Sequence, residues 1–398
     1  MTPHKRIPGH RFLHSPGPTR VPDEVMDAMR RQPMDLADPR LDGVIQACET
    51  GLKALLQTAT ADVFLYACNG HGAWEAVIAN LLAPGQQVLI AGTGHFSESW
   101  AVQAEAMGAQ VLRTPWREGY PIDVPAIEAA LRADTSHAIV AVFVVHTDTA
   151  SGMTSDPGLV RQALDAAAHP ALLVVDVVAS LGAAPFGMDA LGANVVLGAS
   201  QKGLMVPPGL AFVAADARAM KVAAANPAPR FYWDWARRQS PLSYRKFCGT
   251  PPQSLLYGLQ AALGLIFHEG VEEVIARHRL IAGAVHAAVE AWSEGGALSL
   301  FVREPAARSV SVTTVSVAAG IDPEALRSVA REQFQVAIAG GLGPLAGRTF
   351  RIGHLGDMNP AMILGCLAGV EAAMRVQGIP IGSGGVQHAV AALAAGQR

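Results

Sequence analysis

The chain contains 398 residues, which is longer than one simple hydrophobic core requires and predicts two domains in one enzyme-sized unit. Apolar residues make up 51% of the sequence and charged residues 16%, a balance that excludes a disordered protein. The net charge is −3 and no run of like charges stands out, so neither nucleic acid nor an anionic membrane is an expected partner.

The four cysteines, Cys48, Cys68, Cys248 and Cys366, are far apart and form no C-x-x-C pair. We therefore expect reduced thiols and no zinc or other metal site. The amino terminus is basic but lacks the apolar core of a secretory signal, and no stretch resembles a membrane span. Cytoplasmic localisation is the default expectation.

Residues 1–22 are rich in proline, glycine and histidine and predict an irregular N-terminal arm. From residue 63 onward, apolar runs alternate with helical patterns such as Gly72–Leu82 and Pro125–Ala133. This alternation is typical of an α/β fold with a mostly parallel sheet covered on both faces. The seven predicted strands are Val63–Cys68, Gln87–Ala91, Gln110–Arg113, Ala138–Val145, Leu172–Val175, Val195–Leu197 and Ala211–Ala214.

After about residue 250, long helical patterns replace the short alternation and predict a smaller C-terminal α+β domain. We place the arm at residues 1–22, a large domain at 23–275 and a small domain at 276–398. The Ala-rich tail is expected to be partly disordered. The elements predicted in this part are helices Gln253–His268, Val271–Trp292, Pro323–Gln333 and Pro360–Gln377, and strands Ser309–Val317 and Thr349–Ile352.

Glycine-rich or polar turns follow several predicted strands, where open α/β sheets bind their ligands. The turn Asn69-Gly70-His71-Gly72 precedes a helix and could admit a phosphate, although such turns more often serve only the chain reversal. Phe96 could stack on a flat cofactor or pack in the core. Thr149 could bind a ligand oxygen or satisfy its own turn.

Two charged residues follow neighbouring apolar runs. Asp176 ends the run Ala171–Val175, and Lys202 lies in the phrase Ala199-Ser200-Gln201-Lys202-Gly203. Taken alone, such an aspartate is more often a helix cap and such a lysine a solvated cation. Together with the turns above, they predict one assembled site. A Schiff-base lysine and an acid for a pyridinium nitrogen are what pyridoxal phosphate (PLP) requires.

Arg351 lies within a predicted apolar strand, in Phe350-Arg351-Ile352-Gly353-His354. A buried arginine needs a partner. That partner could be a protein carboxylate in a salt bridge or a substrate carboxylate bound by the planar guanidinium.

These residues resemble the class V, fold-type I PLP aminotransferases, specifically the serine–glyoxylate and alanine–glyoxylate group, over nearly the whole chain. The motifs that carry the resemblance are Ser15-Pro16-Gly17-Pro18-Thr19, the pairing of Asp176 with Ser200-Gln201-Lys202, Leu255-Leu256-Tyr257-Gly258-Leu259, Ile275-Ala276-Arg277-His278-Arg279, Gly340-Gly341-Leu342-Gly343-Pro344 and Phe350-Arg351-Ile352-Gly353-His354-Leu355-Gly356.

The resemblance implies PLP as the cofactor and a fold-type I architecture. Lys202 would form the Schiff base, Asp176 would bind the pyridine nitrogen, and Arg351 would bind the substrate carboxylate. The other implied PLP contacts are Phe96 on the ring, Thr149 near the phenolic oxygen, Gly70, His71 and Gln201 at the phosphate, and Thr250 at the phosphate from the other subunit of a homodimer.

Four departures from the family pattern bear on cofactor binding and donor choice. They are Asn69 in place of a small or hydroxyl residue, Asp148 at a usual glutamate position, Val177-Val178-Ala179-Ser180 after Asp176, and Phe247 in place of a phosphate-binding tyrosine that Tyr244 could replace. A lost hydroxyl would remove one hydrogen bond worth about 1–3 kcal/mol.

The implied reaction transfers an amino group from serine or alanine to glyoxylate and gives glycine and a 2-oxo acid. Aspartate or another amine remains an alternative donor. A PLP-dependent lyase or desulfurase of the same fold is the alternative reaction, although Cys248 lies where the family has non-catalytic residues. A PLP-binding regulator or structural dimer is the third possibility, but it would not need both Lys202 and Arg351.

Overall fold

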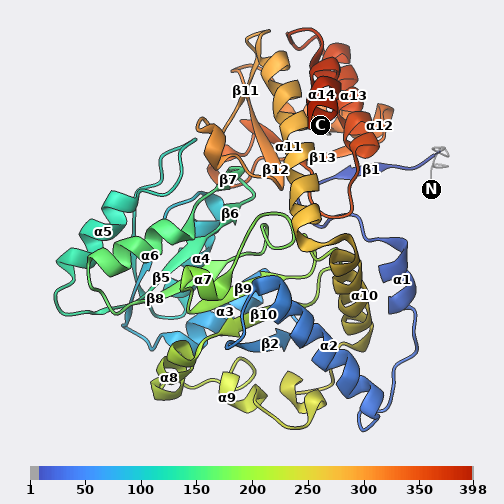
Figure 1. Ribbon diagram of the computed structural model, residues 1–398. Helices are drawn as coiled ribbons and strands as arrows, with labels where there is room; N and C mark the ends of the chain where they lie inside the picture. The colour runs from blue at the N-terminus through green and yellow to red at the C-terminus, as the bar shows by residue number, and fades with distance from the viewer. Residues whose placement is uncertain (1–8, 397–398) are drawn as a thin grey trace, which may run out of the picture.

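The computed structural model describes residues 9–396, so the first eight residues of the predicted arm lie outside it. It contains a seven-stranded sheet, a five-stranded sheet and a two-stranded hairpin (Figure 1). Within the described residues, no helix combines the length and the apolar character needed to cross a membrane.

The seven-stranded sheet has the order β2-β10-β9-β8-β5-β3-β4. Only β10 runs antiparallel to its neighbours, so the predicted mostly parallel sheet is confirmed. Each predicted apolar run coincides with one strand. The strands are β2 (Asp62–Tyr66), β3 (Gln87–Ile90), β4 (Gln110–Arg113), β5 (Ile139–Val145), β8 (Leu172–Asp176), β9 (Val195–Ala199) and β10 (Ala211–Ala215).

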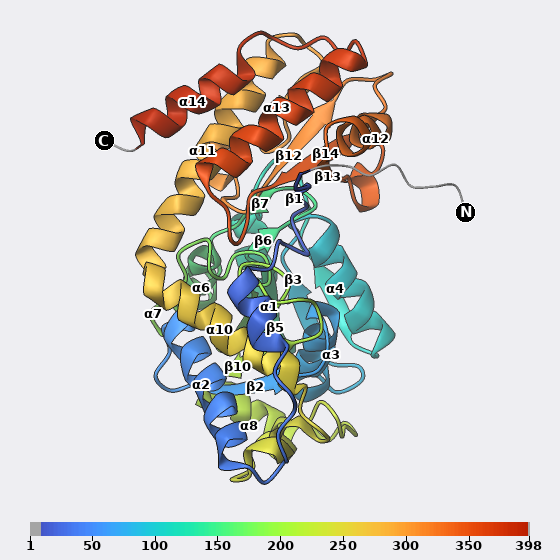
Figure 2. The same ribbon diagram turned by 90° about the vertical axis from the view of Figure 1, so that its right-hand side faces the viewer.

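Helices cover both faces of this sheet, as the apolar strands require (Figures 1 and 2). On β8, Leu173 and Val175 belong to one core cluster and Val174 to the other, because successive side chains point to opposite faces. The helices of this part are α1 (Asp23–Met29), α2 (Pro39–Leu56), α3 (Gly70–Leu81), α4 (His95–Ala106), α5 (Val124–Ala133), α6 (Pro157–Ala166), α7 (Met188–Leu191), α8 (Ala217–Ala225), α9 (Trp235–Arg238) and α10 (Gln253–Glu269), with the 3₁₀ turn η1 (Ser243–Phe247).

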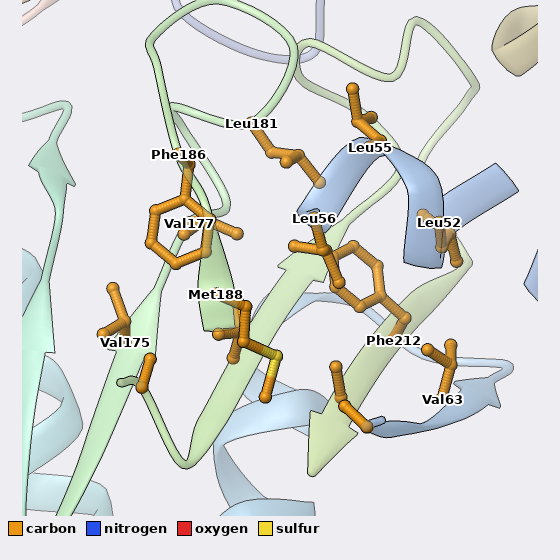
Figure 3. Close-up of a cluster of buried hydrophobic side chains, with 14 of the residues drawn as sticks. Leu52, Leu55, Leu56, Val63, Val175, Val177, Leu181, Phe186, Met188 and Phe212 are labelled. Carbon is orange, nitrogen blue, oxygen red and sulfur yellow. The ribbon is translucent and has the colours of Figure 1, made fainter. Parts of the chain in front are cut away.

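Helix α2 shows how the sequence produces this packing. Leu52, Leu55 and Leu56 recur at helical spacing, and Figure 3 shows them on the side of α2 that faces Phe212 and Val63 of the sheet. All three leucines are buried. This core fixes the strands beneath the turns that carry the predicted site residues.

The five-stranded sheet has the order β1-β13-β14-β12-β11. Its strands are β1 (Phe12–His14), β11 (Leu298–Leu300), β12 (Val312–Val317), β13 (Val336–Gly340) and β14 (Thr349–Gly353). Strand β1 comes from the arm that the sequence predicts to be irregular, and it pairs in parallel with β13. His14 is buried there and its Nδ1 contacts the Gly353 carbonyl at 3.0 Å, so tertiary pairing orders a segment with little strand propensity.

Four helices accompany the small sheet: α11 (Val271–Ser293), α12 (Pro323–Gln333), α13 (Pro360–Val376) and α14 (Gly385–Ala395). Helix α11 runs through the predicted domain limit at residue 275, and the three domain ranges stay a prediction. The expectation of a partly disordered tail is wrong for residues 385–395, because Ala389 and Leu393 of α14 are buried in the small core. The short elements are β6 (Thr147–Asp148), β7 (Met153–Thr154), η2 (Pro305–Ala307) and η3 (Gly343–Leu345).

Candidate active site

A cavity of about 280 Å³ lies where the parallel strands of the large sheet end. It brings together most of the predicted site residues, namely Gly70, His71, Phe96, Thr149, Asp176, Gln201 and Lys202. It is also lined by Gly17, Pro18, Asn69, Trp74, Val145, Thr147, Val178, Ala179 and Pro208. A larger cavity of about 420 Å³ beside α4 contains neither Asp176 nor Lys202.

Asp176 ends β8 and is only 4% exposed. Its Oδ2 accepts a hydrogen bond from Trp74 Nε1, and its Oδ1 accepts one from the Val178 backbone N–H, both at 2.7 Å. Burial raises the pKa of Asp176 to about 6, although both hydrogen bonds favour the ionised form. A cation placed against this carboxylate would therefore be strongly favoured.

Trp74 is a site residue that the sequence does not reveal, because a tryptophan within an apolar helix is normally a core residue. Its position three residues after His71 places both on one face of α3, and the two rings are 4.5 Å apart. A buried indole N–H also requires an acceptor, and this requirement is the signal that could have indicated its role.

Lys202 is 9% exposed, and its Nζ donates a hydrogen bond to the Pro16 carbonyl at 2.5 Å. Burial, and then the charge of Arg351, lower the pKa of Lys202 to about 8, while Asp176 and Asp148 oppose that shift. The amine is therefore partly neutral near neutral pH, which is the form that acts as a nucleophile or base.

Residues 15–19, here named the N-terminal strap, form one wall beside this lysine. Thr19 donates from its backbone N–H to the Gln201 carbonyl at 3.1 Å and from its hydroxyl to the Lys202 carbonyl at 3.0 Å. Gly17 has a φ of +136°, and a Cβ there would lie 2.5–2.6 Å from the end of the Lys202 side chain. Only glycine leaves room for the lysine in this conformation.

The N-terminus of α3 forms another part of the cavity. Gly70 is the first residue of the helix, and the Asn69 side chain accepts a hydrogen bond from the Gly72 N–H at 3.1 Å. His71 is exposed and its pKa is lowered by partial burial and by His95. The Gln201 Oε1 is buried without a partner among the described residues. The N–H groups of a helix N-terminus can bind an anion, and of the two ends of the Gln201 amide only the NH₂ group, not Oε1, could donate to it.

Arg351 lies on β14 and is 6% exposed. Its Nη1 donates to the Thr149 carbonyl at 2.8 Å and its Nε donates to the Gly340 carbonyl at 2.6 Å. Among residues 9–396, no carboxylate lies within 4.0 Å of this guanidinium, so the salt-bridge alternative is wrong. Burial lowers its pKa to about 10. A buried guanidinium whose protein partners are only carbonyl groups can still bind a carboxylate through its remaining N–H groups.

Arg351 does not itself line the cavity and touches it only through the carbonyl of Thr149. Three further residues from the sequence prediction, Thr250, Phe247 and Tyr244, also lie outside the lining. Thr250 is exposed, so its predicted contact across a dimer interface stays a prediction. Phe247 packs in the large core, and Tyr244 is half-buried outside the cavity.

The comparisons with known proteins agree over most of the chain. The class-V aminotransferase family model matches residues 11–345. The L-aspartate–glyoxylate aminotransferase of Paracoccus denitrificans is 41% identical and covers 93% of each chain. The serine–glyoxylate aminotransferase of Methylorubrum extorquens is 38% identical over 95% of this chain and 94% of its own.

A solved structure, the ureidoglycine–glyoxylate aminotransferase of Bacillus subtilis, superimposes with a TM-score of 0.89 and 28% identity. It covers 98% of this chain and 99% of its own, which confirms the predicted fold-type I architecture. The match of family, fold and length shows that this chain is an aminotransferase and belongs to the class-V aminotransferase family.

Proposed function

We propose that this protein is a PLP-dependent aminotransferase that transfers the amino group of a small amino acid to glyoxylate. The observation that carries this proposal is one cavity lined by both Asp176 and Lys202, with the Arg351 guanidinium, which is bonded only to carbonyls, at the lining residue Thr149. The family implies PLP, and three of the similar proteins are named as glyoxylate aminotransferases, which supports glyoxylate as the acceptor.

The residues of the cavity fit PLP. Asp176 carries a carboxylate whose pKa is raised by burial, and a pyridinium nitrogen would offset that cost. The α3 N-terminus at Gly70 and His71 suits the phosphate, to which the NH₂ group of the lining residue Gln201 could also donate. Phe96 and Thr149 line the same cavity. When bound, PLP would supply the electron-accepting ring that carries the amino group.

Each protein group then has a defined task. Asp176, oriented by Trp74 and Val178, would hold a proton on the pyridine nitrogen. Lys202 would bind the cofactor covalently and, once released, would move the proton of the substrate Cα, because its lowered pKa gives a neutral base near pH 8. Arg351 would bind and orient the substrate carboxylate.

The charges around the cavity bear on the amino donor. Among the described lining residues, only Lys202 and His71 can carry a positive charge, and the pKa of His71 is lowered. These lining residues therefore offer no fixed cation besides Lys202 for the second carboxylate of aspartate, whereas serine and alanine need none. We therefore propose serine or alanine as the donor. Aspartate, which the relative at 41% identity is named for, would need a cation from a second subunit.

The lyase alternative has less support, because no cysteine is among the described residues that line the cavity, and Cys248 lies outside it. A homodimer that shares its active sites, with Thr250 at the partner's phosphate, remains part of the proposal, as does the cytoplasmic location.

A donor panel tests the proposal. The PLP-loaded protein is mixed with serine, alanine or aspartate and with glyoxylate or pyruvate, and glycine and the 2-oxo acid are quantified. Serine or alanine with glyoxylate should give the highest kcat/KM. If glyoxylate gives glycine with aspartate but not with serine or alanine, the donor assignment is overturned. If ammonia is released when no keto acid is added, the transaminase assignment is overturned.

A further inference from the structure

We propose that Asp148 is a positioning residue that couples the segment bearing Phe96 to the turn that holds Arg351. The inference rests on the proposed function, because it assigns a role relative to the cofactor ring and the substrate carboxylate. Asp148 is fully buried, at the end of β6.

The carboxylate of Asp148 joins two loops that are far apart in the sequence. Its Oδ2 accepts hydrogen bonds from the Phe96 backbone N–H at 2.9 Å and the Thr93 hydroxyl at 3.2 Å. Its Oδ1 accepts one from the Ala150 N–H at 2.9 Å. A Cβ on Gly94 would lie 3.0 Å from Oδ2, so the segment before α4 packs directly on this group.

The turn that follows Asp148 binds the small sheet. The Thr149 carbonyl accepts from Arg351 Nη1 at 2.8 Å, and the Ala150 carbonyl accepts from the Thr314 hydroxyl at 3.2 Å. Thr314 and Arg351 are directly paired on β12 and β14. A continuous set of hydrogen bonds therefore runs from Phe96, through Asp148 and its turn, to Arg351.

The chemistry of this junction requires a carboxylate. Both oxygens face N–H or O–H donors, so the NH₂ group of an asparagine would oppose a donor on one side and leave a buried group unpaired. The negative charge of Asp148 also opposes the lowering of the pKa of both Arg351 and Lys202. A displacement of Asp148 would therefore change the positions of both Phe96 and Arg351.

The test compares Asp148→Asn with Asp156→Asn. Asp156 is a matched control because its Oδ1 also accepts from a backbone N–H, that of Gly158 at 2.8 Å, but it caps α6 outside the cavity. We expect Asp148→Asn to weaken PLP binding to the cofactor-free protein and to raise KM for both substrates, each about tenfold. Asp156→Asn should change both by less than about threefold.

A double-mutant cycle with Arg351→Lys separates coupling from general loss of stability. If Asp148 positions the Arg351 guanidinium, the rise in KM of the double variant Asp148→Asn/Arg351→Lys will be smaller than the product of the two single effects. For Asp156→Asn combined with Arg351→Lys, the rise in KM will equal that product. Multiplicative effects for Asp148→Asn, or unchanged PLP affinity and KM, would overturn the inference. PLP affinity is read by absorbance titration, so the result stands apart from whether glyoxylate is the acceptor.

Thr93→Val provides a milder second variant in case Asp148→Asn does not fold. It removes one hydrogen bond to Oδ2 and leaves the charge in place. PLP affinity should fall about threefold and KM should rise in parallel, and no change in either quantity would contradict the role of Asp148.

Discussion

Lys202 Nζ donates a hydrogen bond to the carbonyl of Pro16, 186 residues earlier in the chain, at 2.5 Å. The strap that contains Pro16 also binds the Gln201 and Lys202 carbonyls through Thr19. Because β1 attaches the start of this segment to the small sheet, the strap connects the small sheet with the lysine turn of the large sheet. The proposed catalytic lysine is thus held by backbone groups from the N-terminal part of the chain.

Gly17→Ala should disturb this arrangement selectively. Alanine is strained at the Gly17 φ of +136°, and its Cβ would also come within 2.5–2.6 Å of the flexible end of Lys202, so both the strap and the lysine side chain must shift. We expect the absorbance of lysine-bound PLP to fall and the PLP dissociation constant to rise about tenfold. The control is Gly43→Ala on α2, which meets no atom within 4 Å and should leave PLP binding unchanged. Equal PLP affinity in the two variants would contradict the role of the N-terminal strap in positioning Lys202.

Arg351→Ala should raise KM for the amino acid and the keto acid about a hundredfold, because it removes charged hydrogen bonds to the substrate carboxylate. Steady-state kinetics with each substrate varied in turn will measure this. Arg348→Ala is the control, since that arginine pairs with Glu118 on the surface, where its side chain is 57% exposed. Unchanged KM values for Arg351→Ala would show that Arg351 does not bind the substrate carboxylate.

Trp74→Phe should raise the pKa of Asp176 above its value of about 6, because the indole N–H favours the ionised carboxylate. The protonated carboxyl binds the cofactor nitrogen less well, so the pH at which PLP affinity is half lost should move upward. PLP titrations from pH 5 to 9 will measure it. Trp100→Phe makes the same ring change in a stacked neighbour that has no bond to Asp176, and its profile should match the unaltered protein. Identical profiles for both variants would contradict the assignment.

Buried histidines should make the protein sensitive to mild acid. Burial lowers the pKa of His14, His146, His278 and His286 to about 4. The unfolded chain therefore binds more protons than the folded chain below pH 6.5, so the free energy of unfolding falls as pH drops from 6.5 toward 4. Each histidine contributes on the order of 3 kcal/mol to this loss by pH 4.

Urea unfolding of the cofactor-free protein between pH 8 and 4 will measure this loss. The raised pKa of Asp176 acts in the opposite direction between about pH 6 and the ordinary value of 3.8, because there the folded chain binds the extra proton, and it offsets the contribution of about one of the four histidines. His278→Gln should be less stable at pH 7, because it loses contacts with Val274 and Gly356, but should show a shallower decline in acid. A stability that does not change between pH 6 and 4.5 would disprove the prediction.

The strands of the large sheet were predictable because each is a short apolar run between polar turns. Strand β1 was not, because its order depends on pairing with β13 rather than on its own residues. The approach of Asp176 to the cavity follows from its place at a strand end. The Pro16 carbonyl leaves no signal in the sequence, because every residue has one. Likewise, the sequence left the partner of Arg351 open, and only the position of Thr149 and Gly340 resolves it.

The most direct test compares the PLP-loaded protein with Lys202→Ala in one assay of serine or alanine with glyoxylate. The account predicts glycine and the 2-oxo acid in equal amounts from the unaltered protein. It also predicts that Lys202→Ala loses the absorbance of lysine-bound PLP and at least about 10³-fold of the turnover, because Lys202 is the group proposed to move the Cα proton. Lys202→Ala protein that still catalyses both half-reactions at an undiminished rate would contradict the central claim.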